Sequence, residues 1–317
     1  MMILKKNEIL IGIETSCDET SVSLMINGKI IDEITTSSMD KQFVYGGVVP
    51  ELATRYHQSN IHRIFKSLLN YNNINISEIT NIVYTANPGL PGCLHVGSCF
   101  AKTLSNLIGA KLIPINHLYG HLFSPYINSD IEPHFPLLGL VISGGHTVIY
   151  LAKSYRDIEI LNTTQDDAVG EVYDKVARAL GMGYPGGPKI DKIFNISKAN
   201  INFLKNNFPV DKQFSFSGIK TSVLNYINIV KQKNNHLDIE AISSSFQKII
   251  IDEVIRKVNY YAKLHNVATI SVGGGVAANN YLRSEIKKIN CKSIDISELK
   301  YTGDQASMIV WYGSKLI

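Results

Sequence analysis

The alternation of apolar and polar positions repeats itself in the two halves of the chain. Residues 11–24 combine an apolar strand, a small polar turn and a second alternating strand, and residues 138–151 repeat this order. A third strand is predicted in each copy, near residues 30–35 and 158–162. One copy alone is typical of an ordinary hairpin. Two copies at matching places favour a duplicated nucleotide-binding fold in which each half lends one loop.

Apolar residues at helical spacing predict helices between these strands. The predicted helices are residues 50–69, 97–107, 241–264 and 304–315. Residues 268–272 are a candidate buried strand that leads into three glycines. Residues 214–221 alternate aromatic and hydroxyl side chains, which favours a strand end followed by a helix that Ser217 caps. Alternating strands and helices predict an α/β protein.

Composition indicates an ordinary globular protein but does not indicate its function. The 317 residues are 45% hydrophobic and 18% charged, as in ordinary globular proteins. The net charge of +4 comes mainly from 25 lysines against 6 arginines, which permits an RNA partner but does not argue for one. Four scattered cysteines without a Cys-x-x-Cys pair predict reduced thiols. No signal peptide or apolar run of membrane-spanning length is recognisable, so we expect a cytoplasmic protein without a membrane partner.

A pair of histidines offers candidate metal ligands. His117 and His121 follow an apolar stretch, and residues four apart lie on one face of a helix. Asp304 could complete a set of two histidines and one carboxylate, which suits iron or zinc. Capping or surface histidines and an aspartate that caps the last helix are the alternatives at this point.

Glycine-rich and acidic segments offer candidate ligand loops. Residues 273–275 could let the backbone approach a flat ligand, and Asn279 could bind a base or ribose. Residues 186–187 lie between two prolines and form a second bare segment, beside which Asp174 or Asp191 could accept hydrogen bonds from ribose hydroxyls. A tight turn with a capping asparagine and a helix-face ion pair of Asp174 are the alternatives.

Several ordered motifs together resemble the bacterial TsaD family, the tRNA N6-adenosine threonylcarbamoyltransferases. The motifs are residues 13–20, 45–53, 141–147, 214–221 and 274–279, together with the pair His117 and His121. The resemblance covers nearly the whole chain. It implies an actin-like, sugar-kinase-like (ASKHA) fold of two duplicated lobes around a nucleotide cleft. The implied lobes are an N-terminal one of residues 1–133, completed by about residues 296–317, and a C-terminal one of residues 134–295.

The resemblance also implies a reaction and its site. The threonylcarbamoyl group of threonylcarbamoyl-AMP would pass to the N6 amine of the adenosine beside the anticodon in ANN-decoding tRNAs. One divalent metal, with Fe²⁺ favoured and Zn²⁺ possible, would be held by His117, His121 and Asp304. The donor would be bound by Val141, Ile142, Ser143, Gly144, Gly145, Asp174, Gly187, Asp191 and Asn279. A paralogous actin-like protein and a small P-loop ATPase are the expected protein partners.

The sequence departs from the family pattern near these residues. Asn116 and Tyr119 stand where the family usually has a histidine and a glutamate, Gly303 and Gln305 flank the retained Asp304, and the usual short C-terminal tail is missing. We expect the first changes to affect the support of the metal ligands and the last to affect tRNA or partner contacts.

Other functions fit the sequence less well. A metallopeptidase of the zincin type needs a glutamate directly after the first histidine, and Leu118 occupies that position. An actin-like sugar kinase would need a catalytic aspartate and a sugar pocket, and neither is recognisable. An inactive actin-like scaffold is disfavoured because His117, His121, Asp304 and Asn279 are retained.

Overall fold

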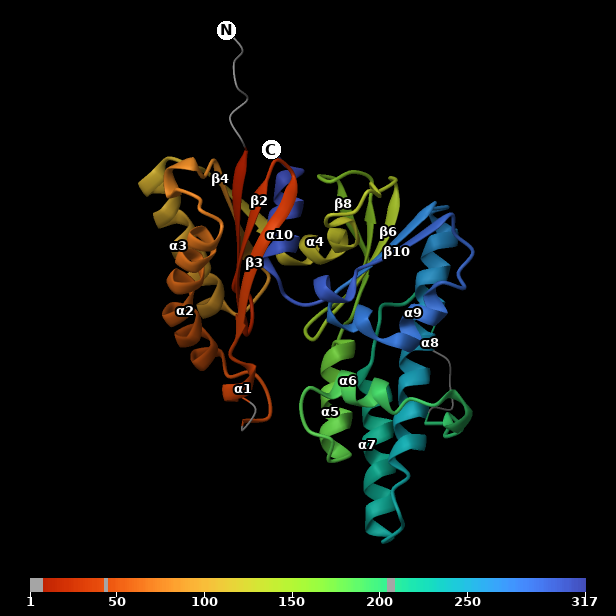
Figure 1. Cartoon of the computed structure of the whole chain (residues 1–317). Helices are drawn as coiled ribbons and strands as arrows, with labels where there is room; N and C mark the ends of the chain where they lie inside the picture. Colours follow the sequence, from red (N-terminus) through yellow and green to blue (C-terminus); the bar gives the residue numbers. More distant parts are fainter. Residues whose placement is uncertain (1–7, 43–44, 204–208) are drawn as a thin grey trace. The chain divides into compact units, whose positions relative to one another are not determined.

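The chain separates into two compact units, of which the first is discontinuous in sequence and the second is one continuous segment (Figure 1). The structure, a computed structural model, describes residues 8–42, 45–203 and 209–317. The first unit is Met1–Glu132 with Gly303–Ile317, and the second is Pro133–Thr302. The chain returns to the first unit later than the expected position near residue 296. The reason is that β10 (Ser293–Ile296) still pairs with β9 (Thr269–Gly273) in the sheet of the second unit.

The first unit is built on a five-stranded sheet with the order β3-β2-β1-β4-β5. Its strands are β1 (Ile9–Glu14), β2 (Glu19–Ile26), β3 (Lys29–Ser37), β4 (Asn81–Asn87) and β5 (Lys111–Asn116). The strands β1, β2 and β3 form an antiparallel meander, whereas β4 pairs in parallel with both β1 and β5. The predicted third strand at residues 30–35 lies within β3.

The second unit repeats this sheet. Its strands are β6 (Leu137–Ile142), β7 (Thr147–Ala152), β8 (Ile158–Thr163), β9 and β10. Read from β8, the order β8-β7-β6-β9-β10 has the same antiparallel meander followed by two parallel neighbours. The duplication expected from residues 11–24 and 138–151 is therefore confirmed, because the two segments form β1–β2 and β6–β7 respectively.

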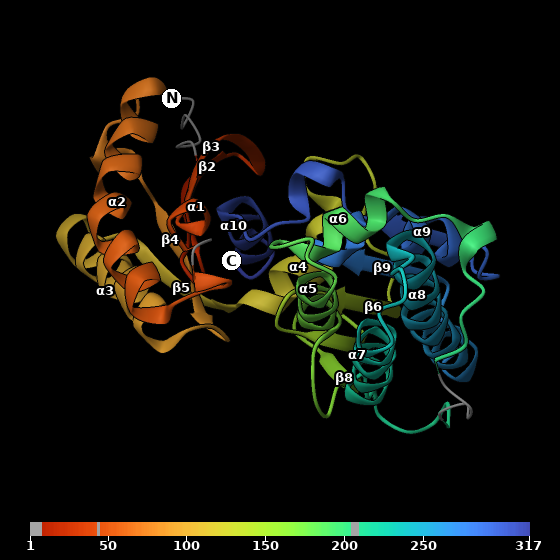
Figure 2. The same cartoon turned by 90° about the horizontal axis from the view of Figure 1, so that it is seen from below.

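Helices cover both faces of the first sheet (Figures 1 and 2). They are α1 (Met39–Gln42), α2 (Pro50–Tyr71), α3 (Pro91–Ile108), α4 (His117–Phe123) and α10 (Ala306–Ser314). On one face α2 and α3 cover a core that includes Ile11, Ile13 and Leu24, and α10 packs on the other face of the sheet. The helix α3 begins six residues before the predicted position 97, because Pro91 fits the first helical turn although Pro-Gly resembles a loop.

Gly12 lets α10 approach the sheet closely. Side chains along a strand alternate between its faces, so Gly12 faces away from the core that contains Ile11 and Ile13. A Cβ atom at Gly12 would lie 2.6 Å from the Ala306 carbonyl oxygen and 2.8 Å from Val310 Cβ. A glycine is therefore required where the last helix crosses the first strand.

The helices of the second unit share one large core with its sheet. They are α5 (Val169–Ala179), α6 (Gly186–Lys192), α7 (Ser217–Gln232), α8 (Ile239–Leu264) and α9 (Asn280–Ile286). Buried side chains of β6, β9, α5, α7 and α8 pack into this core. The prediction of residues 241–264 as a helix is confirmed by α8. The short helix η5 (Gly275–Ala278) lies between β9 and α9.

One predicted helix cap, Ser217, is wrong, and the alternative in which Asp304 caps the last helix is excluded. Asp304 does not open the last helix, since α10 starts at Ala306 after Gln305 as N-cap residue. Ser217 is the first residue of α7, and the N-cap residue Phe216 has no capping side chain of its own. The amides at this helix start instead donate to the Asp166 carboxylate, at 2.8 Å from Phe216 N and 3.3 Å from Ser217 N to Oδ1. No helix among the described residues has the length and hydrophobicity that a membrane crossing requires.

Candidate metal centre and nucleotide site

The histidine pair lies at the start of α4, directly after β5. Asn116 ends the strand and caps the helix, because its Oδ1 accepts the Leu118 amide at 2.8 Å. His117 is thus the first residue of α4 and His121 lies one turn later, with 4.7 Å between ring centroids. Both are buried, His117 being 5% and His121 0% exposed. The local sequence therefore fixes two imidazoles side by side in the interior of the first unit.

Asp304 meets both histidines from the segment that precedes α10. Its Oδ1 lies 3.0 Å from His121 Nε2 and 3.5 Å from His117 Nε2. The possible ligand atoms of the three residues all lie within 4.8 Å of one another. Within the described ranges, this is the one such group of three His, Cys, Asp or Glu side chains. The Asp304 carboxylate therefore does not cap α10 but faces the two imidazoles.

Glu14 orients His117 from behind. Its Oε2 lies 3.0 Å from His117 Nδ1 and also accepts the Thr85 hydroxyl, while Oε1 accepts the Ser16 amide. An ionised carboxylate only accepts hydrogen bonds, so His117 donates Nδ1–H to Glu14 and, in its neutral form, carries its lone pair on Nε2, which faces Asp304. Such a carboxylate–histidine contact is typical of metal sites. Sequence reasoning missed Glu14, which was only one member of the motif at residues 13–20.

The charges of this cluster suit a cation. Burial alone would lower the pKa of His117, but Glu14 and Asp304 together raise it well above its usual value. Burial alone would raise the pKa of Asp304, but His117 and His121 hold it well below its usual range. Burial, and then the charges of Asp304 and Asp18, raise the pKa of Glu19 to about 10. The carboxylates thus exceed what the histidines balance, and a proton or a metal ion can supply the missing positive charge.

The donor set therefore fits a divalent metal. Two imidazole nitrogens and a carboxylate oxygen converge in a buried place, which is a ligand set that iron and zinc both accept. His121 Nδ1 is buried and has no hydrogen-bond partner among the described residues. The departures from the family pattern stay outside this set: Asn116 caps α4, and the Tyr119 ring packs edge-on against Tyr312 at 5.9 Å between centroids.

A bare turn follows the first strand of the second unit. Ser143 accepts the His146 amide through Oγ at 3.2 Å and donates its own amide to the His146 carbonyl at 2.8 Å. Gly144 and Gly145 are exposed, and a Cβ atom on either would meet nothing within 4 Å. Five residues of this segment were predicted to bind the threonylcarbamoyl-AMP donor. The remaining two, Val141 and Ile142, are strand residues of the core with 0% exposure. The turn can thus present backbone to a ligand, whereas those two side chains cannot reach one.

The turn is held by the start of α5. The Gly170 amide donates to the Ser143 carbonyl at 3.2 Å, and the Val169 amide donates to Thr147 Oγ1 at 3.1 Å. A Cβ atom at Gly170 would lie 2.7 Å from Gly144 Cα, so the two backbones touch. The position of the turn therefore depends on the position of α5.

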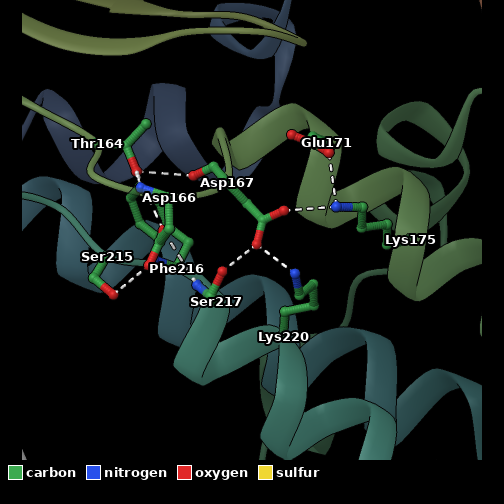
Figure 3. A network of polar contacts seen from close by, with 9 residues as sticks. All are labelled: Thr164, Asp166, Asp167, Glu171, Lys175, Ser215, Phe216, Ser217 and Lys220. Carbon is green, nitrogen blue, oxygen red and sulfur yellow. Dashed lines mark hydrogen bonds and ion pairs between the residues drawn. The ribbon is translucent and has the colours of Figure 1, made fainter.

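A charged network ties α5 to α7 (Figure 3). The Asp167 carboxylate accepts Lys175 Nζ at 2.6 Å through Oδ1, and its Oδ2 accepts both the Ser217 hydroxyl and Lys220 Nζ. Burial opposes the charge of Asp167, but the hydrogen bonds from Lys175, Lys220 and Ser217 lower its pKa far below the ordinary range. Asp166 alongside accepts the Ser215 hydroxyl at 2.6 Å. Sequence reasoning missed this aspartate pair.

The remaining predicted donor residues fall into two groups. Asp174 accepts the Gly186 amide at 2.6 Å and so holds the start of α6, while Gly187 beside it has open space around its Cα. Asp191, at the other end of α6, accepts the Asn280 amide at 3.1 Å and its side chain at 2.8 Å. Asn279, 7% exposed, caps α9 by accepting the Leu282 amide at 2.8 Å. Asn279 thus caps α9, and the next residue, Asn280, contacts Asp191.

Gln247 joins the second group and was not predicted. It lies on α8 with 0% exposure, donates to Asp191 and accepts from Asn279. Its position on a helix with core spacing made it resemble an ordinary interior residue. A polar side chain in a core stretch was the available signal.

Comparison with known families decides the identity of the chain. The family model described as "TsaD: tRNA N6-adenosine threonylcarbamoyltransferase" matches residues 29–311. The chain belongs to the TsaD family. It is therefore a transferase, and the resemblance inferred from the sequence motifs is confirmed.

Relatives of this TsaD protein match over nearly their whole length. The tRNA N6-adenosine threonylcarbamoyltransferase of Ureaplasma parvum serovar 3 is 50% identical over 314 residues, 99% of this chain and 97% of its own. The protein of the same name from Thermosipho africanus is 45% identical over 319 residues, 97% of this chain and 94% of its own.

Solved structures support the fold of this TsaD protein. HypF from T. kodakarensis has a TM-score of 0.59 at 14% identity, over 99% of this chain and 48% of HypF. The activator of 2-hydroxyisocaproyl-CoA dehydratase from Clostridium difficile, with bound ADPNP, has a TM-score of 0.52 at 15% identity, over 97% and 95% of the two chains. With the repeated sheets, these likenesses confirm the ASKHA-like fold class.

Proposed function

We propose that this TsaD protein transfers the threonylcarbamoyl group of threonylcarbamoyl-AMP to the N6 amine of the adenosine beside the anticodon of ANN-decoding tRNAs. A bond forms between N6 and the carbamoyl carbon, the bond from that carbon to the AMP phosphate oxygen breaks, and N6 loses a proton. The relatives bear the name of this transfer to tRNA. The observation that carries the proposal is the buried convergence of His117, His121 and Asp304 in a chain of this family.

We assign one divalent metal per chain to this cluster, with Fe²⁺ favoured and Zn²⁺ possible. The two imidazole Nε2 atoms and an Asp304 oxygen would hold it, and Glu14 would keep His117 in the tautomer that leaves Nε2 free. When bound, the metal would supply positive charge that orients the threonylcarbamoyl group and polarises its carbonyl. Leu118 stands where a zincin carries its general-base glutamate, which argues against a peptidase role.

The nucleotide part of the donor is assigned to the second unit. The exposed backbone of Gly144 and Gly145, next to the buried Ser143, would approach the phosphate, since bare turns expose N–H groups to anions. The Asp191 carboxylate would accept hydrogen bonds from ribose hydroxyls. These residues bind and orient the donor, which lowers the barrier by positioning because AMP is already a good leaving group.

The protein is proposed to act with others. We retain a paralogous actin-like protein and a small P-loop ATPase as partners, on the basis of the family. A cytoplasmic location fits a tRNA substrate and the four free cysteines.

Mass balance with the preformed donor tests the proposal. Purified protein with its partners, tRNA and threonylcarbamoyl-AMP should release one AMP for each threonylcarbamoyladenosine formed. Transcripts with guanosine in place of the target adenosine serve as control. They should yield no threonylcarbamoyladenosine and no more AMP than spontaneous hydrolysis of the donor releases. Modified tRNA without AMP release would refute the donor, and AMP release without modified tRNA would refute the acceptor.

A further inference from the structure

A buried glutamine connects two of the residues assigned to the nucleotide donor. Gln247 Nε2 lies 2.9 Å from Asp191 Oδ1, and Gln247 Oε1 lies 3.0 Å from Asn279 Nδ2. Gln247 comes from α8, Asp191 from α6 and Asn279 from the start of α9, all within the second unit. Gln247 is 0% exposed, so these contacts replace rather than supplement contacts with solvent.

The hydrogen bonds of this group have only one consistent direction. The Leu282 amide donates to Asn279 Oδ1, which leaves Asn279 Nδ2 as the donor to Gln247 Oε1. Gln247 Nε2 is then the donor to Asp191 Oδ1, while Asp191 Oδ2 accepts from Asn280. Each amide orientation is therefore fixed by its neighbour, starting from a backbone N–H that can only donate.

The group also contains a buried hydroxyl. Tyr173 lies on α5, and its side chain is 1% exposed. Burial, and then the charge of Asp191, raise the pKa of Tyr173 well above the ordinary value, while a side-chain hydrogen bond with Asn279 opposes the shift. Tyr173 thus remains protonated beside a carboxylate whose orientation Gln247 determines.

We propose that Gln247 is a positioning residue of the nucleotide donor site, which acts by holding the Asp191 carboxylate and the Asn279 amide in one fixed arrangement. The inference rests on the proposed function, because it takes Asp191 and Asn279 as residues that bind the donor. Gln247 itself is fully buried and does not touch the ligand. It matters because a carboxylate that is held in place loses little freedom on binding.

A glutamate at this position separates positioning from packing. Gln247→Glu keeps the shape of the side chain, but its ionised form cannot donate to Asp191 and adds a like charge next to it. The protonated form has one O–H donor and one carbonyl acceptor, as the amide does, so acid should restore the arrangement. Gln247→Met removes both hydrogen bonds, and acid cannot restore them because methionine has no titratable group.

The experiment is calorimetric titration of AMP into the full-length wild-type protein and its variants at about pH 8.5 and about pH 5.5. The quantity compared is the ratio of variant to wild-type dissociation constants at each pH, which cancels the titration of the AMP phosphate. Ser243→Ala is the matched control: it lies one turn earlier on α8 at 0% exposure, and its hydroxyl has no hydrogen-bond partner within the described residues.

We expect Gln247→Glu to bind AMP about tenfold more weakly than wild type at the higher pH, and to recover most of this loss at the lower pH. Gln247→Met should bind AMP more weakly than wild type at both pH values. Ser243→Ala should bind AMP as tightly as wild type at both. Equal affinity of Gln247→Glu and wild type, or a loss that acid does not reverse, would overturn the inference while the proposed donor site stands. Failure of the wild-type protein to bind AMP would overturn the donor site and the inference with it.

Discussion

His117 donates its Nδ1–H to Glu14 across 3.0 Å, which turns the opposite ring nitrogen toward Asp304. The two residues lie at the ends of two strands of one sheet that β4 separates: Glu14 ends β1, and His117 follows β5. The first sheet therefore determines the tautomer of a candidate metal ligand. This contact explains why Glu14, an acidic residue with 0% exposure, is tolerated in the interior.

Replacing Glu14 should weaken metal binding. The Glu14 carboxylate accepts hydrogen bonds from His117, Ser16 and Thr85. Glu14→Gln replaces one carboxylate oxygen with an NH₂ group, which cannot accept and therefore opposes at least one of these donors. Loss of a carboxylate behind a metal-bound histidine costs about 10- to 100-fold in affinity. Competition with a chromogenic chelator measures this, with the exposed Glu51→Gln as control. Unchanged metal affinity in Glu14→Gln would show that the tautomer is fixed in another way.

Removing Asp304 should reduce the metal content further. Asp304→Ala deletes the carboxylate among the three proposed ligands His117, His121 and Asp304, so metal per chain after anaerobic purification should fall below that of Glu14→Gln. Elemental analysis gives this value, and Asp130→Ala, an exposed residue of the same unit, is the control. If Asp304→Ala retained its metal, Asp304 would not be a ligand.

The Asp167 network should stabilise the protein in a pH-dependent way. Asp167→Asn weakens contacts with Lys175 and Lys220, for which we expect a loss of about 1–3 kcal/mol in the free energy of unfolding near pH 7. The folded-state pKa of Asp167 is lowered, so its contribution is complete above the ordinary aspartate pKa of about 4 and is lost as the pH falls below it.

Urea unfolding of wild type and Asp167→Asn over this pH range measures that contribution. The difference between the two proteins should shrink as the pH falls from about 5 to about 3. The exposed Asp157→Asn should show no such difference. A gap that stays constant or widens in acid is incompatible with a lowered pKa of Asp167.

Asp166, not Ser217, should protect the start of α7. Asp166→Ala removes the acceptor of the Phe216 and Ser217 amides, which costs about 1 kcal/mol and speeds their hydrogen exchange roughly fivefold. Ser217→Ala leaves that acceptor in place, so the exchange of the same amides should change less. Faster exchange in Ser217→Ala than in Asp166→Ala would reinstate the serine as the cap.

Much of the fold was predictable because it depends on local patterns. The apolar alternation in residues 11–24 and 138–151 indicated both copies of the meander, and the sheets confirm it. The motifs indicated the family. The His117/His121 spacing pointed to a shared helix face, and α4 provides it.

The errors and omissions depend on tertiary contacts. An aspartate before a helix has the same local signature whether it caps the helix or turns toward distant histidines, so both roles of Asp304 stayed open and the predicted last helix began two residues too early. Asp166 caps a helix that begins about fifty residues later, as its contact with Phe216 shows. Gln247 fits the helical pattern of α8, and only the fold reveals that it faces Asp191.

Mass spectrometry of nucleosides from tRNA incubated with this protein, ATP, threonine, bicarbonate and the partner enzymes is the decisive test of the proposed transfer. Threonylcarbamoyladenosine should form at the position beside the anticodon with the metal-loaded wild-type protein, and little of it should form with Asp304→Ala. Unmodified tRNA from the metal-loaded wild-type protein, with partners shown separately to produce threonylcarbamoyl-AMP, would contradict the proposed transfer.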